Sequence, residues 1–153
     1  MREERVISGI KYRNPYYKGE MLKNYLVSSC GKIYSLLTSK FLTPTVSGNT
    51  AYPRVGIRLN GKSKHPNVHQ LVASAWVKKP IPEGISKEIW IKTPAEVKSL
   101  IDRDLWEIDH INTIKYDFRA ENLRWVSRSK NKSVYYNEQK PILESSTLEE
   151  FLA

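Results

Sequence analysis

Short apolar stretches separated by turn residues dominate the first half of the chain. Residues 25–36 (YLVSSCGKIYSL) predict two strands around a Ser-Cys-Gly turn. Residues 52–59 alternate between apolar and polar positions, and Asn60-Gly61 directly afterwards is a strong signal for a two-residue hairpin with a return strand to about Val68. Residues 1–24 are polar, aromatic and without a clear period, and predict an irregular lead-in. A small antiparallel sheet with one apolar face is therefore expected.

The hydrophobic period changes to that of helices near residue 69. Residues 69–77 (HQLVASAWV) predict a short buried helix that ends before two prolines. Residues 83–92 are ambiguous. Thr93-Pro94 is typical of a helix N-cap followed by proline, and residues 95–104 (AEVKSLIDRD) continue as an amphipathic helix. Short apolar stretches at 105–108 and 123–126 predict strands, and the basic segment 128–136 predicts a further helix.

These elements indicate an α+β fold with five segments. A small N-terminal antiparallel β-sheet precedes a compact strand–loop–strand–helix unit. The expected segments are a lead-in (1–24), a sheet module with a short helix (25–78), a helical insert (79–104), the strand–loop–strand–helix unit (105–137) and a tail (138–153).

The distribution of charge along the chain indicates what kind of partner the protein binds. The 153 residues carry a net charge of +9, and the tail from 138 to 153 contributes −3, so the first 137 residues carry +12. A charge of this size attracts polyanions, and nucleic acid is the leading partner; a basic surface without a partner is the alternative. Four basic residues share the polar face of the predicted hairpin: Arg54, Arg58, Lys62 and Lys64. We expect them to contact the DNA backbone; an ordinary solvated face of the sheet is the alternative.

Several classes of protein are excluded by composition. The single cysteine, Cys30, excludes an internal disulfide framework and zinc sites that need two or more cysteines. No apolar run approaches the 18 residues or so of a membrane span. The first ten residues are charged and lack the apolar core of a secretory signal, so we expect a cytoplasmic protein.

The residues that carry chemistry lie between Glu107 and Lys132 (EIDHINTIKYDFRAENLRWVSRSKNK). A short strand delivers Asp109 and His110, whose side chains point to opposite faces and therefore have different roles. A strand–loop–strand–helix unit of this size can bring Asp109 and Asn131 together, where one oxygen from each can hold a divalent ion.

This region resembles the HNH endonucleases, and in particular the subgroup found among phage and intron homing endonucleases. The resemblance is carried by DHI followed by Asn, by ENLRWVSRSKN, and by an asparagine nine residues after the first motif asparagine. The upstream segments VHQLVASAWV and YLVSSCGKIYSL extend it over about residues 25–133.

The resemblance implies a ββα-metal nuclease unit at 105–137. His110 would be the general base, Asp109 and Asn131 the ligands of one Mg²⁺ or Mn²⁺ ion, and Asn122 would fix the loop and orient the imidazole of His110. The implied partner is double-stranded DNA, bound by a monomer that nicks one strand or a homodimer that cuts both, in a bacterial or phage-infected cell. Further phosphate contacts are expected from Arg124, Arg128, Lys130 and Lys132.

Some positions depart from the family pattern. Asn112-Thr113-Ile114 stands where relatives commonly have Asn-Gly-Asp, and Asp117-Phe118-Arg119 stands in place of Asp-Asn-Arg. His69 is interpreted as a capping or packing residue, with metal ligation as the alternative. Two other functions compete with the nuclease: a non-catalytic DNA-binding protein that retains the fold, and an RNA-binding module in which tyrosines stack on bases.

Overall fold

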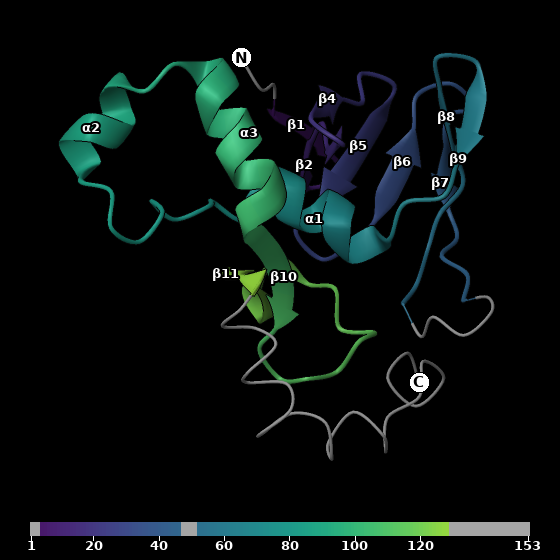
Figure 1. Cartoon of the computed structure of the whole chain (residues 1–153). Coiled ribbons are helices and arrows are strands. Elements are labelled where there is room, and N and C mark those ends of the chain that lie inside the picture. The colour runs from purple at the N-terminus through teal and green to yellow at the C-terminus, as the bar shows by residue number, and fades with distance from the viewer. Residues whose placement is uncertain (1–3, 47–51, 129–153) are drawn as a thin grey trace.

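The structure is a computed structural model that describes residues 4–46 and 52–128. It has the predicted α+β fold, with antiparallel strands and few helices (Figure 1). The main sheet has the strand order β1-β2-β5-β6-β7, formed by Glu4–Ile7 (β1), Ile10–Arg13 (β2), Tyr25–Ser28 (β5), Ile33–Ser35 (β6) and Lys40–Leu42 (β7). Three further antiparallel pairs are Tyr16–Tyr17 (β3) with Glu20–Met21 (β4), Ile57–Leu59 (β8) with Lys62–Lys64 (β9), and Trp106–His110 (β10) with Leu123–Ser127 (β11).

The prediction of an irregular lead-in was wrong for the part of residues 1–24 that the structure describes. Strands β1 and β2 pair across residues 8–9, and β3 and β4 pair across residues 18–19. All four turn residues have φ between 49° and 80°, the left-handed backbone of tight hairpins. Tyr12 in β2 is only 1% exposed, so this segment contributes to the core instead of preceding it.

The hairpin predicted at Asn60-Gly61 is confirmed, although both of its strands are shorter than expected and the return strand ends at Lys64 instead of near Val68. The two turn residues have φ of 52° and 77°, as a type I′ turn requires. Only residues 57–59 form a regular strand, because Arg54 makes isolated bridges to two neighbouring segments instead of joining the ladder. The predicted apolar face is correct, since Val55 and Ile57 are each 2% exposed.

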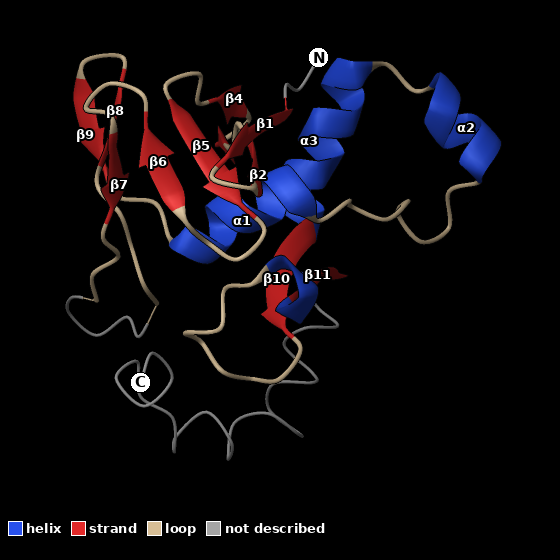
Figure 2. Ribbon diagram, turned by 180° about the vertical axis from the view of Figure 1, so that it is seen from behind, coloured by secondary structure: helices blue, strands red, loops and turns tan. Residues whose placement is uncertain are grey.

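Helix α1 (Val68–Trp76) confirms the predicted buried helix and lies at the centre of the molecule (Figure 2). Its core face is fully enclosed: Val68, Leu71 and Val72 are 0% exposed. The helix packs against β3 and β5 on one side and against β10 and β11 on the other. The indole of Trp76 donates a hydrogen bond of 2.9 Å to the carbonyl oxygen of Val27 in the main sheet. A single helix therefore joins the N-terminal sheet to the unit that carries the motif.

Two helices, α2 (Lys87–Lys92) and α3 (Ala95–Leu105), project from this body (Figure 1). Helix α3 confirms the predicted amphipathic helix, but the predicted cap was wrong: Pro94 is the N-cap, and the Thr93 hydroxyl donates to the carbonyl oxygen of Ile89 in α2. Neither helix contains a buried residue, and α3 continues into β10 without a loop. Among the described residues we find no helix with the length and apolar character of a membrane span.

Candidate active site at the end of strand β10

Two neighbouring residues at the end of β10 form the centre of the candidate site. Asp109 and His110 lie opposite Arg124 and Leu123 of β11, and are 4% and 6% exposed. As expected for neighbours on a strand, their side chains have different surroundings. Asp109 contacts Arg124, whereas His110 contacts His69 of α1. The carboxylate and the imidazole therefore occupy separate environments although they are adjacent in sequence.

The carboxylate of Asp109 is held by an ion pair that the sequence did not predict. The Nε of Arg124 donates a hydrogen bond of 2.6 Å to Oδ2 of Asp109. The side chain of Arg124 is 49% exposed, so the guanidinium connects a buried carboxylate to the protein surface. The pairing depends on the register of β10 and β11, which the sequence alone does not specify.

His110 lies in a cluster of rings. Its ring stacks on Tyr52 with centroids 5.6 Å apart and meets the ring of His69 edge to face at 4.9 Å. Burial lowers the pKa of His110 to about 4; the nearby carboxylates of Asp109 and Asp117 oppose this shift without cancelling it. The imidazole is therefore neutral at cellular pH, which is the form that accepts a proton.

His69 is buried at the start of α1, and its prediction as a packing residue is consistent with its surroundings. Its ring lies 4.7 Å from that of Tyr52, and it is 7% exposed. Burial, together with the neighbouring His110, lowers the pKa of His69 to about 3. Its proximity to His110 was not predicted.

Asn122 fixes the loop that follows β10. Its backbone carbonyl accepts from the N–H of Ile111, and its side-chain oxygen accepts from the N–H of Asn112 at 2.9 Å. Its amide nitrogen donates to Oδ1 of Asn112 and to the carbonyl oxygen of Asp117, each at 2.9 Å. The prediction of a loop-fixing residue agrees with these bonds. However, they go to the loop and not to the imidazole of His110, so the hydrogen bond expected between Asn122 and His110 is absent from the described network.

A second support of the loop is a buried carboxylate that sequence reasoning did not single out. Asp117 is 0% exposed and accepts bonds of 2.7 Å from Nε and Nη2 of Arg119 and from the amide of Asn112. Burial by itself would raise the pKa of Asp117, but these hydrogen bonds and the charge of Arg119 hold it below its ordinary value. The side chain is therefore charged and satisfied inside the loop.

The departure at Thr113 has a visible backbone consequence. Thr113 stands where the family resemblance implies glycine, and its φ is +65°. A β-branched residue adopts this left-handed conformation at a cost, because its side chain crowds the backbone. Its hydroxyl oxygen is also buried without a hydrogen-bond partner in the described part of the chain. The loop keeps its closed form in spite of this residue, through the bonds of Asn122 and Asp117.

The other predicted residues are distributed over the surface. Arg128 is exposed, with its Nε 4.0 Å from a carboxylate oxygen of Glu107. The basic residues predicted on the hairpin lie around β8 and β9, which both figures place apart from β10 and β11 (Figures 1 and 2). Three predicted residues lie outside the described residues: Asn131, Lys130 and Lys132.

The described donors are compatible with one hard cation but do not complete its site. The oxygens of Asp109 are of the kind that Mg²⁺ and Mn²⁺ prefer. Within residues 4–46 and 52–128 there is no group of three or more histidine, cysteine, aspartate or glutamate side chains placed to hold a metal ion. The described residues therefore do not supply three ligands of these types, and the second predicted ligand, Asn131, lies outside these ranges.

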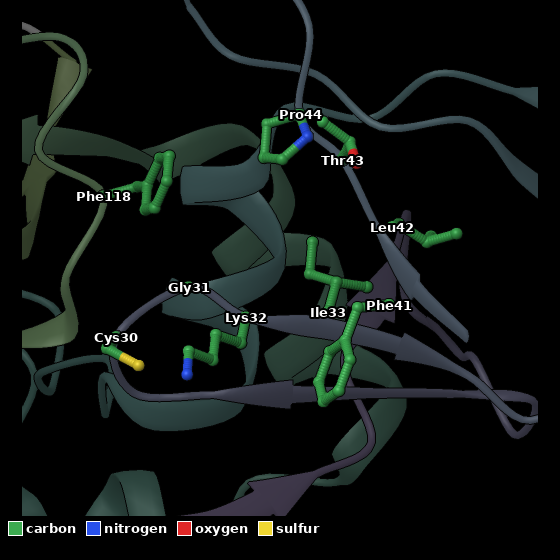
Figure 3. Close-up of a pocket in the computed structure, with 9 residues that line it drawn as sticks. All are labelled: Cys30, Gly31, Lys32, Ile33, Phe41, Leu42, Thr43, Pro44 and Phe118. Carbon is green, nitrogen blue, oxygen red and sulfur yellow. The ribbon is translucent and has the colours of Figure 1, made fainter. Parts of the chain in front are cut away.

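An apolar cavity of about 380 Å³ lies beside the loop but apart from Asp109 and His110 (Figure 3). Its walls include Ile33, Phe41, Leu42 and Phe118. The ring of Phe118 covers Gly31, which has φ of +93°, so that any side chain at this position would overlap the ring. This contact seats the loop on the turn between β5 and β6. The cavity thus marks the junction between the sheet and the candidate site.

Comparisons with known proteins agree with this arrangement. A sequence profile of the family described as HNH endonuclease matches residues 68–133. The chain is 30% identical over 113 residues to an uncharacterized HNH endonuclease, L247, of Acanthamoeba polyphaga mimivirus; the match covers 73% of this chain and 23% of that protein. It is also similar to a solved structure that concerns DNA binding and cleavage by the HNH homing endonuclease I-HmuI, with a TM-score of 0.53 and 25% identity over 88% of this chain and 57% of that one. The chain therefore spans less than two thirds of the length of either protein.

Proposed function

We propose that the chain hydrolyses phosphodiester bonds of double-stranded DNA, because residues 68–133 match the HNH endonuclease family. The observation that carries the proposal is the buried, neutral imidazole of His110 beside the carboxylate of Asp109 at the end of β10. The resemblance inferred from the motif is confirmed by the comparisons, and the residue roles below are part of the proposal.

His110 acts as the general base that takes a proton from the attacking water. A neutral imidazole has a free lone pair on one ring nitrogen, and proton transfer of this kind contributes about 10²–10⁴-fold to a rate. Asn122 and Asp117 keep the loop after His110 closed through their hydrogen bonds. This rigidity holds the end of β10, and so the imidazole, in one position.

Enzymes of this family generally use a divalent metal ion. We propose that Asp109 and Asn131 hold one Mg²⁺ or Mn²⁺ ion, which would stabilise negative charge at the phosphate and on the leaving oxygen. Because Arg124 already donates to Oδ2 of Asp109, this guanidinium orients the carboxylate and partly neutralises it.

DNA is held mainly through its phosphates by two basic surfaces. The first consists of Arg124 and Arg128, together with Lys130 and Lys132 from outside the described residues. The second consists of Arg58, Lys62 and Lys64 on the β8–β9 hairpin and Arg54, which precedes it. A two-stranded ribbon fits the major groove, so we expect the hairpin to contact base edges as well as phosphates. This surface would direct the duplex toward the chemistry at β10.

The proposal is tested by cleavage of supercoiled plasmid DNA with Mg²⁺ or Mn²⁺. We expect nicked or linear product, abolished by EDTA, and a loss of at least about 100-fold in His110→Ala. Equal cleavage by the variant and the wild type would remove the role of His110. Cleavage that persists in EDTA would remove the metal. The ratio of nicked to linear product distinguishes a monomer that cuts one strand from a dimer that cuts both.

A second candidate, a non-catalytic DNA-binding protein, is favoured by one observation. Arg124 occupies an oxygen of the carboxylate that the nuclease would use for its cation. Specific DNA binding without cleavage under any divalent ion would support this alternative.

A further inference from the structure

His69 and His110 come from different elements, α1 and β10, and meet in the interior. Their ring centroids are 4.9 Å apart with an interplanar angle of 68°. Their exposed fractions are 7% and 6%, and the ring of Tyr52 packs against both. Burying two imidazoles away from water lowers the stability of the fold unless their ring nitrogens form hydrogen bonds.

Each ring has one enclosed nitrogen without a hydrogen-bond partner in the part of the chain that the structure describes. These atoms are Nδ1 of His69 and Nε2 of His110. A buried polar atom left unsatisfied costs about 1–3 kcal/mol. The coincidence of two such atoms on adjacent rings therefore requires an explanation.

The two nitrogens are chemically complementary. A neutral imidazole carries one N–H donor and one lone pair, so one ring can donate to the other. At this separation the bond can form directly after a small rotation of a ring, or through one bridging water. Either arrangement satisfies both enclosed atoms at once.

The direction of the bond decides which nitrogen of His110 is free to act as a base. We infer that His69 is a positioning residue for the general base: Nδ1 of His69 accepts the Nε2–H of His110, directly or across one water. This bond holds His110 in the tautomer whose Nδ1 carries the lone pair. Since a ring nitrogen's role is set by the hydrogen bond of the other nitrogen, His69 selects the atom of His110 that takes the proton from water. The inference rests on the proposed function for the direction of the bond: Nε2 of His110 is enclosed, so a base at this position must act through Nδ1, and Nε2 must then carry the proton.

The first test reads the tautomer without using activity. Nitrogen-15 NMR of the full chain with labelled histidine distinguishes protonated from unprotonated ring nitrogens at pH 7.5. We expect His110 to be protonated at Nε2 and unprotonated at Nδ1. Protonation at Nδ1, or an equal mixture of the two tautomers, would overturn the inference even if the protein is an active nuclease. This measurement needs no variant, so a folding defect cannot obscure it.

The second test compares His69→Asn with His69→Leu, two side chains of the same branching and nearly the same size. Only asparagine offers an acceptor near the position of Nδ1. We expect His69→Leu to lose about tenfold or more in kcat with little change in KM and to shift His110 toward a mixed tautomer, while His69→Asn keeps most of the rate and the Nε2–H tautomer. Equal losses in both variants, with an unchanged tautomer, would reduce His69 to a packing residue. If the wild type does not cleave DNA, the proposed function fails, and the NMR comparison still decides this inference.

Discussion

Acidification between pH 6.5 and pH 5 is expected to destabilise the protein through its two buried histidines. In an unfolded chain a histidine has a pKa near 6.5. In the folded protein burial lowers the pKa of His110 to about 4 and that of His69 to about 3. Below pH 6.5 the unfolded state therefore binds protons that the folded state does not. The contribution of these residues to stability is complete above pH 6.5 and is lost as the pH falls.

The size of the effect follows from the two pKa shifts. Between pH 6.5 and the folded pKa, each histidine removes about 1.4 kcal/mol of unfolding free energy per pH unit. From pH 7.5 to pH 5 the loss is about 2 kcal/mol for one histidine and about 4 kcal/mol for both. This is a large part of the roughly 5–15 kcal/mol that stabilises a typical domain. Asp117 does not contribute to this loss, because its lowered pKa keeps the carboxylate charged throughout this pH range.

Urea denaturation of the full chain at a series of pH values between 7.5 and 5 measures this loss. His110→Gln should reduce the pH dependence by about half, since one of the two buried imidazoles is removed. His65→Gln is the matched control, because His65 is the remaining histidine and has an exposed side chain. A wild-type loss below about 1 kcal/mol, or an equal effect of the control substitution, would refute the reasoning.

Further predictions concern the loop, the ion pair and the basic surface. Thr113→Gly should raise the unfolding free energy by about 1 kcal/mol, because glycine adopts the φ of +65° without strain; a lower value in urea denaturation would contradict this. Asp117→Asn should lower it by about 2–3 kcal/mol by removing charged hydrogen bonds, and an unchanged denaturation midpoint would show that the network is dispensable. Arg124→Gln should tighten Mn²⁺ binding several-fold in calorimetry, since a competing cation leaves Asp109; weaker binding would mean that Arg124 only orients the carboxylate. The double substitution of Lys62 and Lys64 by alanine should reduce the salt dependence of DNA affinity by about two counterions, whereas an unchanged slope would place the DNA elsewhere.

Local patterns predicted most of the elements. The Asn60-Gly61 turn, the period of α1 and the apolar stretches of β10 and β11 each depend on a few adjacent residues, and each was confirmed. The strands before residue 24 were missed because they are short and because β1 (ERVI) is a largely exposed edge strand without alternation of polar and apolar positions. Their only strong signals were the two glycines of the hairpin turns, at positions 9 and 19.

The candidate site was predictable as a motif but not as a set of contacts. Asp109 and His110 could be recognised because they are adjacent and correctly spaced from the asparagines. Their partners Arg124 and His69 could not, because the first depends on strand register and the second on the packing of a helix from another part of the chain. Contacts that form only through tertiary packing are not visible as a periodic pattern in the sequence.

The central position of α1 has a consequence for any attempt to transfer the unit that carries the motif to another protein. The family match begins at residue 68, which is the first residue of α1, as if the part of the chain from α1 onward could fold independently. Yet Leu71 and Val72 belong to a core shared with strands that precede the match, including Val27 of β5. Excision at residue 68 would remove the apolar partners of the helix that precede this residue and expose its apolar face to water. The smallest fragment that keeps the candidate site folded must therefore also contain the N-terminal sheet, so the proposed DNA-binding surface and the proposed catalytic residues cannot be separated by a cut at this position.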